Sequence, residues 1–275
     1  MFDHAPNCDD HALMQDPAFA QALRLCGQSP ITLPGGLTVL IRCFRGIRVA
    51  MLPRAAPPVD LREQLRAVGL ARCPLILSPD HPTVVPRAIR LRRARQIAVM
   101  PLSASDQTRR AALHPKWRNQ LKRAEMTKLK VSVTHLPPTP DTAILRAETH
   151  QASQRGYSNW PAPLTAAFAA AAPAKTHLFE AKQKGQTIAS MLFLTHGLTA
   201  TYHIGHITPQ GRSCCAHNLL LWEASMRLKR QGYENIDLGQ LHPQTPDLNR
   251  FKLRAGAQVK NTDGTYLLWH PFARR

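Results

Sequence analysis

The alternation of apolar and polar positions predicts a regular series of elements in the second half of the chain. From Lys130 onward the expected order is β-α-α-β-β-β-α-β-α-β-β, in which strands alternate and helices repeat their apolar positions at helical spacing. The longest helix, 216–233, follows three consecutive strands and a loop at 208–215. We therefore expect a mixed sheet with helices on its faces.

The first hundred residues predict a smaller α+β unit. The pair Asp16-Pro17 is typical of a helix start, and two apolar runs turn at Arg45-Gly46 as neighbouring strands do. Ile89 and Leu91 alternate with arginines, which indicates a half-buried strand. Taken together the pattern predicts an α/β (α+β) fold without an internal repeat.

Composition narrows the class of protein. The chain has 275 residues, of which 44% are hydrophobic and 19% charged, so it can bury one sizeable core or two small ones. No apolar run is long enough to span a membrane, and the N-terminal segment MFDHAPNCDD lacks the apolar region of a secretory signal. Six cysteines occur without CxxC spacing. We expect a cytoplasmic protein without a disulfide framework.

Charge points to an anionic partner. The chain carries 36 Lys and Arg against 17 Asp and Glu, a net charge of +19. Thirteen of these basic residues lie between Arg87 and Lys130, with only two acids among them, and this region includes a predicted helical connector broken at Pro115. Such density is found on solvated helix faces and on surfaces that bind nucleic acid, phosphate-bearing cofactors or lipid headgroups.

Two motifs carry a resemblance to a known family. The segment 113–131 contains Lys116-Trp117-Arg118-Asn119, and the segment 202–256 contains Asp237-Leu238-Gly239 followed by Phe251-Lys252 and a glycine at 256. Both are similar to signatures of the Fem-type (FemAB-like) subgroup of the GNAT (GCN5-related) acyltransferase superfamily. The element order resembles the GNAT fold as well.

The resemblance implies two GNAT-like halves, of which the N-terminal one is short and degenerate. Residues 1–104 would form that half, 105–129 a basic helical connector and 130–275 the acyltransferase domain. The implied reaction moves an acyl or aminoacyl group to an amine acceptor by direct attack in a ternary complex. The donor is acyl-CoA or aminoacyl-tRNA, the latter held through the basic region 87–130, and no cofactor stays bound. The alternative is a non-catalytic module that binds tRNA or other nucleic acid on a GNAT scaffold.

Three residues are candidates for the chemistry that the resemblance implies. Lys252 corresponds to a family lysine near the donor ester, where a fixed cation would stabilise a tetrahedral oxyanion. Tyr202 would give a proton to the leaving group, and Asp237 would accept one from the attacking amine. The structural alternatives are a helix-surface lysine for Lys252 and a cap of the next turn for Asp237.

The loop before the long helix is the candidate donor-phosphate site. A helix N-terminus attracts phosphates, and GNAT enzymes hold the pyrophosphate of coenzyme A at this loop. The candidate residues here are Gln210, Gly211, Arg212, Ser213 and Ala216. The second small position of the family motif is not matched cleanly, and a capped turn is the alternative. The reactivity of Cys214 and Cys215 stays open.

The substrate-binding candidates lie on the connector and near Lys252. They are Lys116, Trp117, Arg118, Asn119, Arg250 and Arg254. Trp117 has a packing role as its alternative. No metal site is expected, since His203 and His206 are three apart on a strand and the adjacent cysteines have poor zinc spacing.

Overall fold

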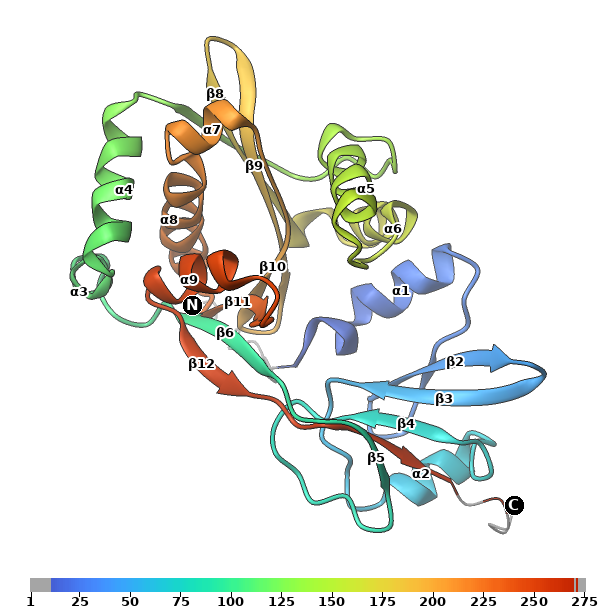
Figure 1. Cartoon of the computed structure of the whole chain (residues 1–275). Coiled ribbons are helices and arrows are strands. Elements are labelled where there is room, and N and C mark those ends of the chain that lie inside the picture. The colour runs from blue at the N-terminus through green and yellow to red at the C-terminus, as the bar shows by residue number, and fades with distance from the viewer. Residues whose placement is uncertain (1–10, 270, 272–275) are drawn as a thin grey trace, which may run out of the picture.

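Two mixed sheets form the framework of the protein in a computed structural model that describes residues 11–269 and 271 (Figure 1). The smaller sheet has the strand order β1-β2-β3-β4-β13-β5. Its strands are β1 (Ile31–Thr32), β2 (Thr38–Phe44), β3 (Ile47–Pro53), β4 (Leu75–Ser78), β13 (Thr265–Leu268) and β5 (Ile89–Arg92). The predicted turn at Arg45-Gly46 is confirmed, because it joins β2 to β3 in an antiparallel pair.

The larger sheet has the order β12-β6-β11-β10-β9-β8-β7. Its strands are β12 (Gln258–Asn261), β6 (Gln96–Pro101), β11 (Asn235–Gln240), β10 (Thr199–Ile207), β9 (Gln186–His196), β8 (Thr176–Gln183) and β7 (Lys130–Thr134). Only β10 and β11 run parallel in this sheet. The predicted α/β fold with GNAT-like mixed sheets and flanking helices is thus confirmed.

Helices cover both faces of the larger sheet (Figure 1). In chain order the first four α-helices among the described residues are α1 (Pro17–Leu25), α2 (Leu61–Ala67), α3 (Asp106–Ala112) and α4 (Pro115–Met126), of which α2 packs on the smaller sheet. They are followed by α5 (Ala143–Arg155), α6 (Ala162–Ala171), α7 (Pro209–Ser213), α8 (Ala216–Arg230) and α9 (Pro246–Arg254). Helices α4 and α8 pack together on one face, with α8 against β9, and α5 packs against β10 on the other.

Local chemistry explains where these helices begin. Asp16 caps α1 as predicted, because its carboxylate accepts the amide N–H of Ala18 at 2.8 Å and Pro17 occupies the first turn. Pro115 breaks the connector into α3 and α4 by starting the second helix, where a missing N–H does no harm. The loop predicted at 208–215 differs, since most of it forms the short helix α7.

The chain crosses twice between the sheets. From β5 it passes directly into β6, and from β12 it returns to β13. Side chains that follow β3 and β4 therefore reach the larger sheet, where Arg54 contacts Asp237 of β11 and Asp80 contacts Lys260 of β12. The division at 104/105 and 129/130 stays a prediction, whereas strand pairing places β6 in the larger sheet and β13 in the smaller one.

Strand β5 is more exposed than its sequence pattern predicts. The half-buried strand predicted around Ile89 is wrong in its burial, because all of β5 is exposed at the edge of the smaller sheet and Ile89 is 66% exposed. No helix in the described part of the chain is long and apolar enough to cross a membrane. The segment 1–10, on which the expectation of no secretory signal rests, lies outside the described residues.

Candidate functional site

The parallel pair in the larger sheet separates partway along its length. Strands β10 and β11 pair only from Thr199 and Asn235 to Thr201 and Asp237. Beyond that point β10 continues to Ile207 beside β9, while β11 bends toward β6 with an irregular register. We call this separation the strand fork; it comprises residues 202–207 and 238–240. A bulge in β10 between Tyr202 and Ile204 increases the local twist at the fork.

Lys252 lies at the β11 side of the strand fork. Helix α9 holds it, and its side chain is buried, with 5% exposed. The ammonium donates a hydrogen bond to the carbonyl oxygen of Gln240 at 2.9 Å. Burial lowers the pKa of Lys252 from 10.5 to about 8, and the charge of Asp237 opposes this shift. A buried ammonium that stays mostly charged at neutral pH is suited to stabilising a developing oxyanion.

Asp237 marks the start of the fork and is held on both sides. One carboxylate oxygen accepts the amide N–H of Gly239 at 2.7 Å, which fixes the turn of β11. The other oxygen accepts a hydrogen bond from the guanidinium of Arg54 at 3.3 Å. Arg54 follows β3 in the smaller sheet and also pairs with Asp80, at 2.7 Å between its Nε and a carboxylate oxygen. Arg54 and Asp80 are site neighbours that no local sequence motif indicates.

Tyr202 lies on the β10 side of the fork. Its ring contacts Phe193 at 5.6 Å between centroids, and its hydroxyl lies directly over Gly205. A Cβ at Gly205 would stand 1.7 Å from that oxygen, so this position accepts only glycine while the tyrosine keeps its place. Burial raises the pKa of Tyr202. The phenol therefore keeps its proton at neutral pH and is a weaker acid than an exposed tyrosine.

A buried carboxylate on α5 faces the same strand and was missed from the sequence. Glu148 is 7% exposed, and it accepts hydrogen bonds from the Tyr157 hydroxyl at 3.0 Å and the Asn159 amide at 2.9 Å. The same Asn159 amide donates to the backbone oxygen of His203 at the bulge. Burial lowers the pKa of His203 to about 4, so this imidazole is neutral. Only a burial pattern within a helix could have indicated Glu148.

The predicted phosphate loop uses most of its amides internally. The N–H groups of Gly211, Arg212, Cys214 and Cys215 bond to Thr208 and to residues within the loop. Gly211 is packed against β9, where a Cβ would lie 2.3 Å from the backbone oxygen of Ile188.

The remaining loop residues lie at the surface or at the start of α8. Gln210, Arg212 and Ser213 are exposed, and Ala216 begins α8 after Cys215 adopts a left-handed conformation with φ of 55°. Burial raises the pKa of the Cys215 thiol, which disfavours the thiolate. The loop therefore leaves mainly the first amides of α8 to meet an anion.

The connector helix α4 divides the motif residues between core and surface. Trp117 is buried against Phe251 of α9, with 6.1 Å between ring centroids. Lys116 and Asn119 are exposed, and Arg118 is half-buried and donates to the carbonyl of Ala111. Lys122 and Arg123 extend the exposed basic surface of α4. The tryptophan thus links α4 to the helix that carries Lys252.

The two arginines beside Lys252 differ in their exposure. Arg250 is exposed and pairs with Asp247 on its own helix. Arg254 is half-buried, and its carbonyl accepts the His114 N–H at the start of α4. Among the described residues no group of three His, Cys, Asp or Glu side chains could hold a metal ion.

About half of the chain matches a known protein family. Residues 116–252 match the acetyltransferase (GNAT) domain family. The chain belongs to the GNAT superfamily. None of the curated proteins matches it significantly. The matched segment begins at Lys116 and ends at Lys252, so it covers most of both motif segments and the whole strand fork.

Solved structures share the fold of this GNAT protein over nearly its whole length. The structure of FemX has a TM-score of 0.74 and 11% identity, covering 96% of this chain and 94% of that one. The C-terminal domain of a putative lysylphosphatidylglycerol synthetase from Agrobacterium fabrum has a TM-score of 0.60 and 13% identity, with coverages of 94% and 90%. The structure of L-PGS from Bacillus licheniformis has a TM-score of 0.54 and 12% identity, covering 92% of this chain and 87% of that one.

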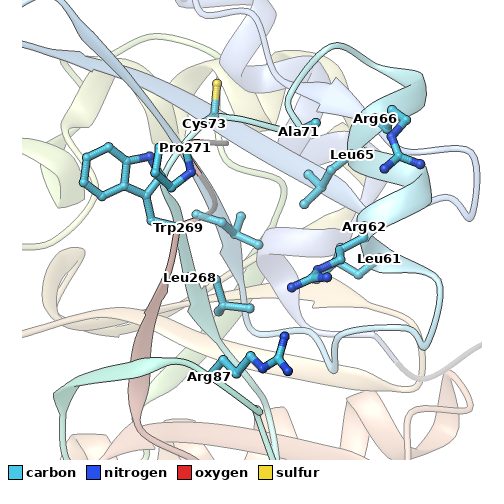
Figure 2. A pocket seen from close by; sticks show the side chains of 11 residues that line it. Leu61, Arg62, Leu65, Arg66, Ala71, Cys73, Arg87, Leu268, Trp269 and Pro271 are labelled. Carbon is cyan, nitrogen blue, oxygen red and sulfur yellow. The ribbon is translucent and has the colours of Figure 1, made fainter. Parts of the chain in front are cut away.

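A separate cavity of the GNAT protein lies on the smaller sheet. It has a volume of about 420 Å³ and is bordered by α2, β4 and the C-terminal strand (Figure 2). Apolar side chains such as Leu65 and Leu268 form its walls, and Arg62, Arg66 and Arg87 also line it. It contains none of the predicted catalytic, donor-phosphate or substrate-binding residues, although Arg87 begins the basic region 87–130.

Proposed function

We propose that the protein transfers an aminoacyl group from aminoacyl-tRNA to a primary amine, without a covalent enzyme intermediate. An acyltransferase of some kind follows from its GNAT domain. The observation that carries the proposal is the buried ammonium of Lys252 at the strand fork, bonded only to the Gln240 carbonyl among the hydrogen bonds of the described residues. A cation in this position is placed to face the carbonyl of a donor that enters between β10 and β11.

The reaction would need positioning more than an activated nucleophile. The neutral amine attacks the carbonyl carbon of the donor ester, and the carbonyl oxygen becomes an oxyanion beside the Lys252 ammonium. Collapse of this intermediate forms the amide bond and breaks the ester bond. The amine loses one proton, for which Asp237 is the predicted acceptor, and the departing hydroxyl gains one, for which Tyr202 is the predicted donor.

Two observations favour tRNA over coenzyme A as the anionic donor. The loop before α8 uses the amides of residues 211, 212, 214 and 215 internally, which leaves a weak cradle for a pyrophosphate. Helix α4 instead offers exposed Lys116, Lys122 and Arg123 beside the motif. A solved structure of similar fold is named as a putative lysylphosphatidylglycerol synthetase, and lysyl is an aminoacyl group, which supports an aminoacyl donor here.

Acyl-CoA is the second candidate donor, because the matched family is named for acetyl transfer and α8 still begins at the expected place. Thermal shift separates the two. Aminoacylated tRNA, uncharged tRNA and acetyl-CoA are added in turn at 50 and 200 mM salt. A ligand at a hundred times its Kd stabilises by about 2.7 kcal/mol, which moves the Tm by several degrees. We expect a shift with charged tRNA that exceeds the shift with uncharged tRNA and weakens at the higher salt.

A transfer assay then tests the chemistry. Radiolabelled aminoacyl-tRNA is incubated with a panel of primary amines, and amide formation is measured for the wild type, K252M and the control K184M. Lys184 is exposed in the turn between β8 and β9. We expect only K252M to lose transfer. Equal shifts with charged and uncharged tRNA, together with no transfer to any amine, would instead indicate a module that binds nucleic acid without catalysis. A shift with acetyl-CoA alone would make coenzyme A the donor.

A further inference from the structure

Arg54 is the one described residue of the smaller sheet that bonds to a predicted catalytic residue. It follows the last residue of β3, where its φ of 51° lies in the left-handed region. A non-glycine residue there is strained by about 1–2 kcal/mol, and such positions persist where surrounding contacts hold them. Here the contacts are two carboxylates, one from each sheet.

The Arg54 guanidinium contacts two carboxylates through two different nitrogen atoms. Its Nε lies 2.7 Å from Asp80, which follows β4, and one terminal nitrogen lies 3.3 Å from Asp237 on β11. The Arg54 side chain is 29% exposed and the Asp237 side chain 13%, so these charges are only partly screened by water. Asp80 also pairs with Lys260 of β12 at 3.5 Å. The network therefore bridges both sheets at the point where β10 and β11 separate.

Asp237 connects this network to Lys252. Asp237 acts on this ammonium through its charge, and its other oxygen fixes the Gly239 amide one residue before the carbonyl that Lys252 binds. Arg54 therefore sets both the position of the Asp237 carboxylate and the fraction of its charge that reaches the ammonium. An ammonium in place of the guanidinium lacks the rigid planar fork whose separate nitrogen atoms reach the two acids here.

We propose that Arg54 is a positioning residue, through which the smaller sheet orients Asp237 and thereby tunes the Lys252 ammonium at the strand fork. The inference rests on the proposed function of Lys252 in transfer. It gives the smaller sheet a role in the reaction, although that sheet holds none of the predicted catalytic residues.

Besides Arg54, several charged groups lie on the elements around Lys252, and R54M leaves all of them unchanged. They are Asp237, Asp80, Lys260 of β12, His196, on which the charge of Asp237 acts, Arg95 through its bond to Gln240, and Asp247, Arg250 and Arg254 on α9. Loss of Arg54 removes a positive charge and leaves Asp237 uncompensated. Both changes favour the charged amine, so the pKa of Lys252 should rise above about 8 in R54M.

The experiment compares R54M with R45M in the full-length protein. Arg45 has nearly the same backbone conformation, with φ of 48°, and is exposed in the turn between β2 and β3. The titration of Lys252 is followed by NMR of ¹³C-labelled lysine side chains, assigned with K252M, and transfer from aminoacyl-tRNA is measured against pH. We expect R54M to raise the midpoint of Lys252 by about half a pH unit or more and to lower kcat about tenfold, equivalent to about 1.4 kcal/mol. R45M should change neither.

Further variants separate positioning from stability. R54K keeps the charge, so it should lower kcat with a smaller change in the Lys252 midpoint, and it also serves if R54M does not fold. D80N combined with R54M should lose no more rate than R54M alone, since both act through one network. A changed Tm with unchanged Lys252 midpoint and pH profile would overturn the proposal. A moved midpoint in a protein that transfers to no amine would support positioning and refute the proposed function.

Discussion

Replacing Lys252 by methionine should stabilise the protein while it greatly slows transfer. The pKa of this lysine falls from 10.5 to about 8 because the amine is buried. One pKa unit is worth about 1.4 kcal/mol, so the charged amine costs the folded state roughly 3 kcal/mol. Methionine has a similar length and no charge, but it leaves the Gln240 carbonyl without its 2.9 Å donor, a loss of about 1 kcal/mol. The net gain is about 2 kcal/mol.

The pH dependence identifies the source of this gain. Below pH 8 both the folded and the unfolded chain carry the proton, so the full cost of the buried charge is present. Between pH 8 and 10.5 the folded protein releases its proton first, and the cost disappears. The advantage of K252M over the wild type should therefore be largest at neutral pH and fade toward pH 10.5.

Urea unfolding of the wild type, K252M and K184M from pH 6 to 10.5 measures the effect. At neutral pH a gain of about 2 kcal/mol raises the Tm of a chain of this size by about 4–8 °C. The transfer rate of K252M should fall by about 10²–10³-fold, as expected when a group that stabilises an oxyanion is lost. If K252M is less stable than the wild type at pH 7, or if its advantage does not change with pH, the reasoning about the buried charge is refuted.

Three further predictions follow from buried groups. W117A should destabilise the protein by about 3–5 kcal/mol in urea unfolding, whereas W117F should cost far less, because the buried indole N–H has no partner among the described residues; equal losses would contradict this. Burial lowers the pKa of His177 to about 4, so the unfolded chain binds its proton first as the pH falls below 6.5, and stability should drop from there to pH 4. H177F should make that drop shallower, and an unchanged slope would show that other groups cause it. Burial and the charge of Glu148 raise the pKa of Tyr157, so E148Q should lower it in an ultraviolet titration; no change would mean that burial alone raises it.

Most elements of the fold could be predicted because their signals are local. The proline after Asp16, the proline that starts α4 and the turn at Arg45-Gly46 act through their own backbone conformations. The burial of β5 could not be predicted in this way. Ile89 alternates as a buried residue would, but β5 lies at the edge of the smaller sheet, and only the sheet order reveals that position.

The candidate site was predictable only in part, and for a related reason. Lys252 and Asp237 lie in motifs, so the sequence indicates each of them, and the structure brings them together at the fork. Arg54 lies 183 residues from Asp237, and Glu148 lies within a helix that shows no motif. Their roles arise from pairings between distant segments, which no periodicity along the chain records.

The positive charge of the protein serves two separate purposes in this scheme. Charges on the exposed face of α4 act through solvent, where salt screens them over about 10 Å at 0.1 M, so they affect how strongly an anionic donor is held. The charge of Lys252 is enclosed, with 5% of the residue exposed, and in the proposed reaction it would act on one atom of the donor with little screening. If Arg54 and Asp237 adjust this enclosed charge from two different sheets, as we propose, the reaction is tuned without any change to the exposed basic face of α4.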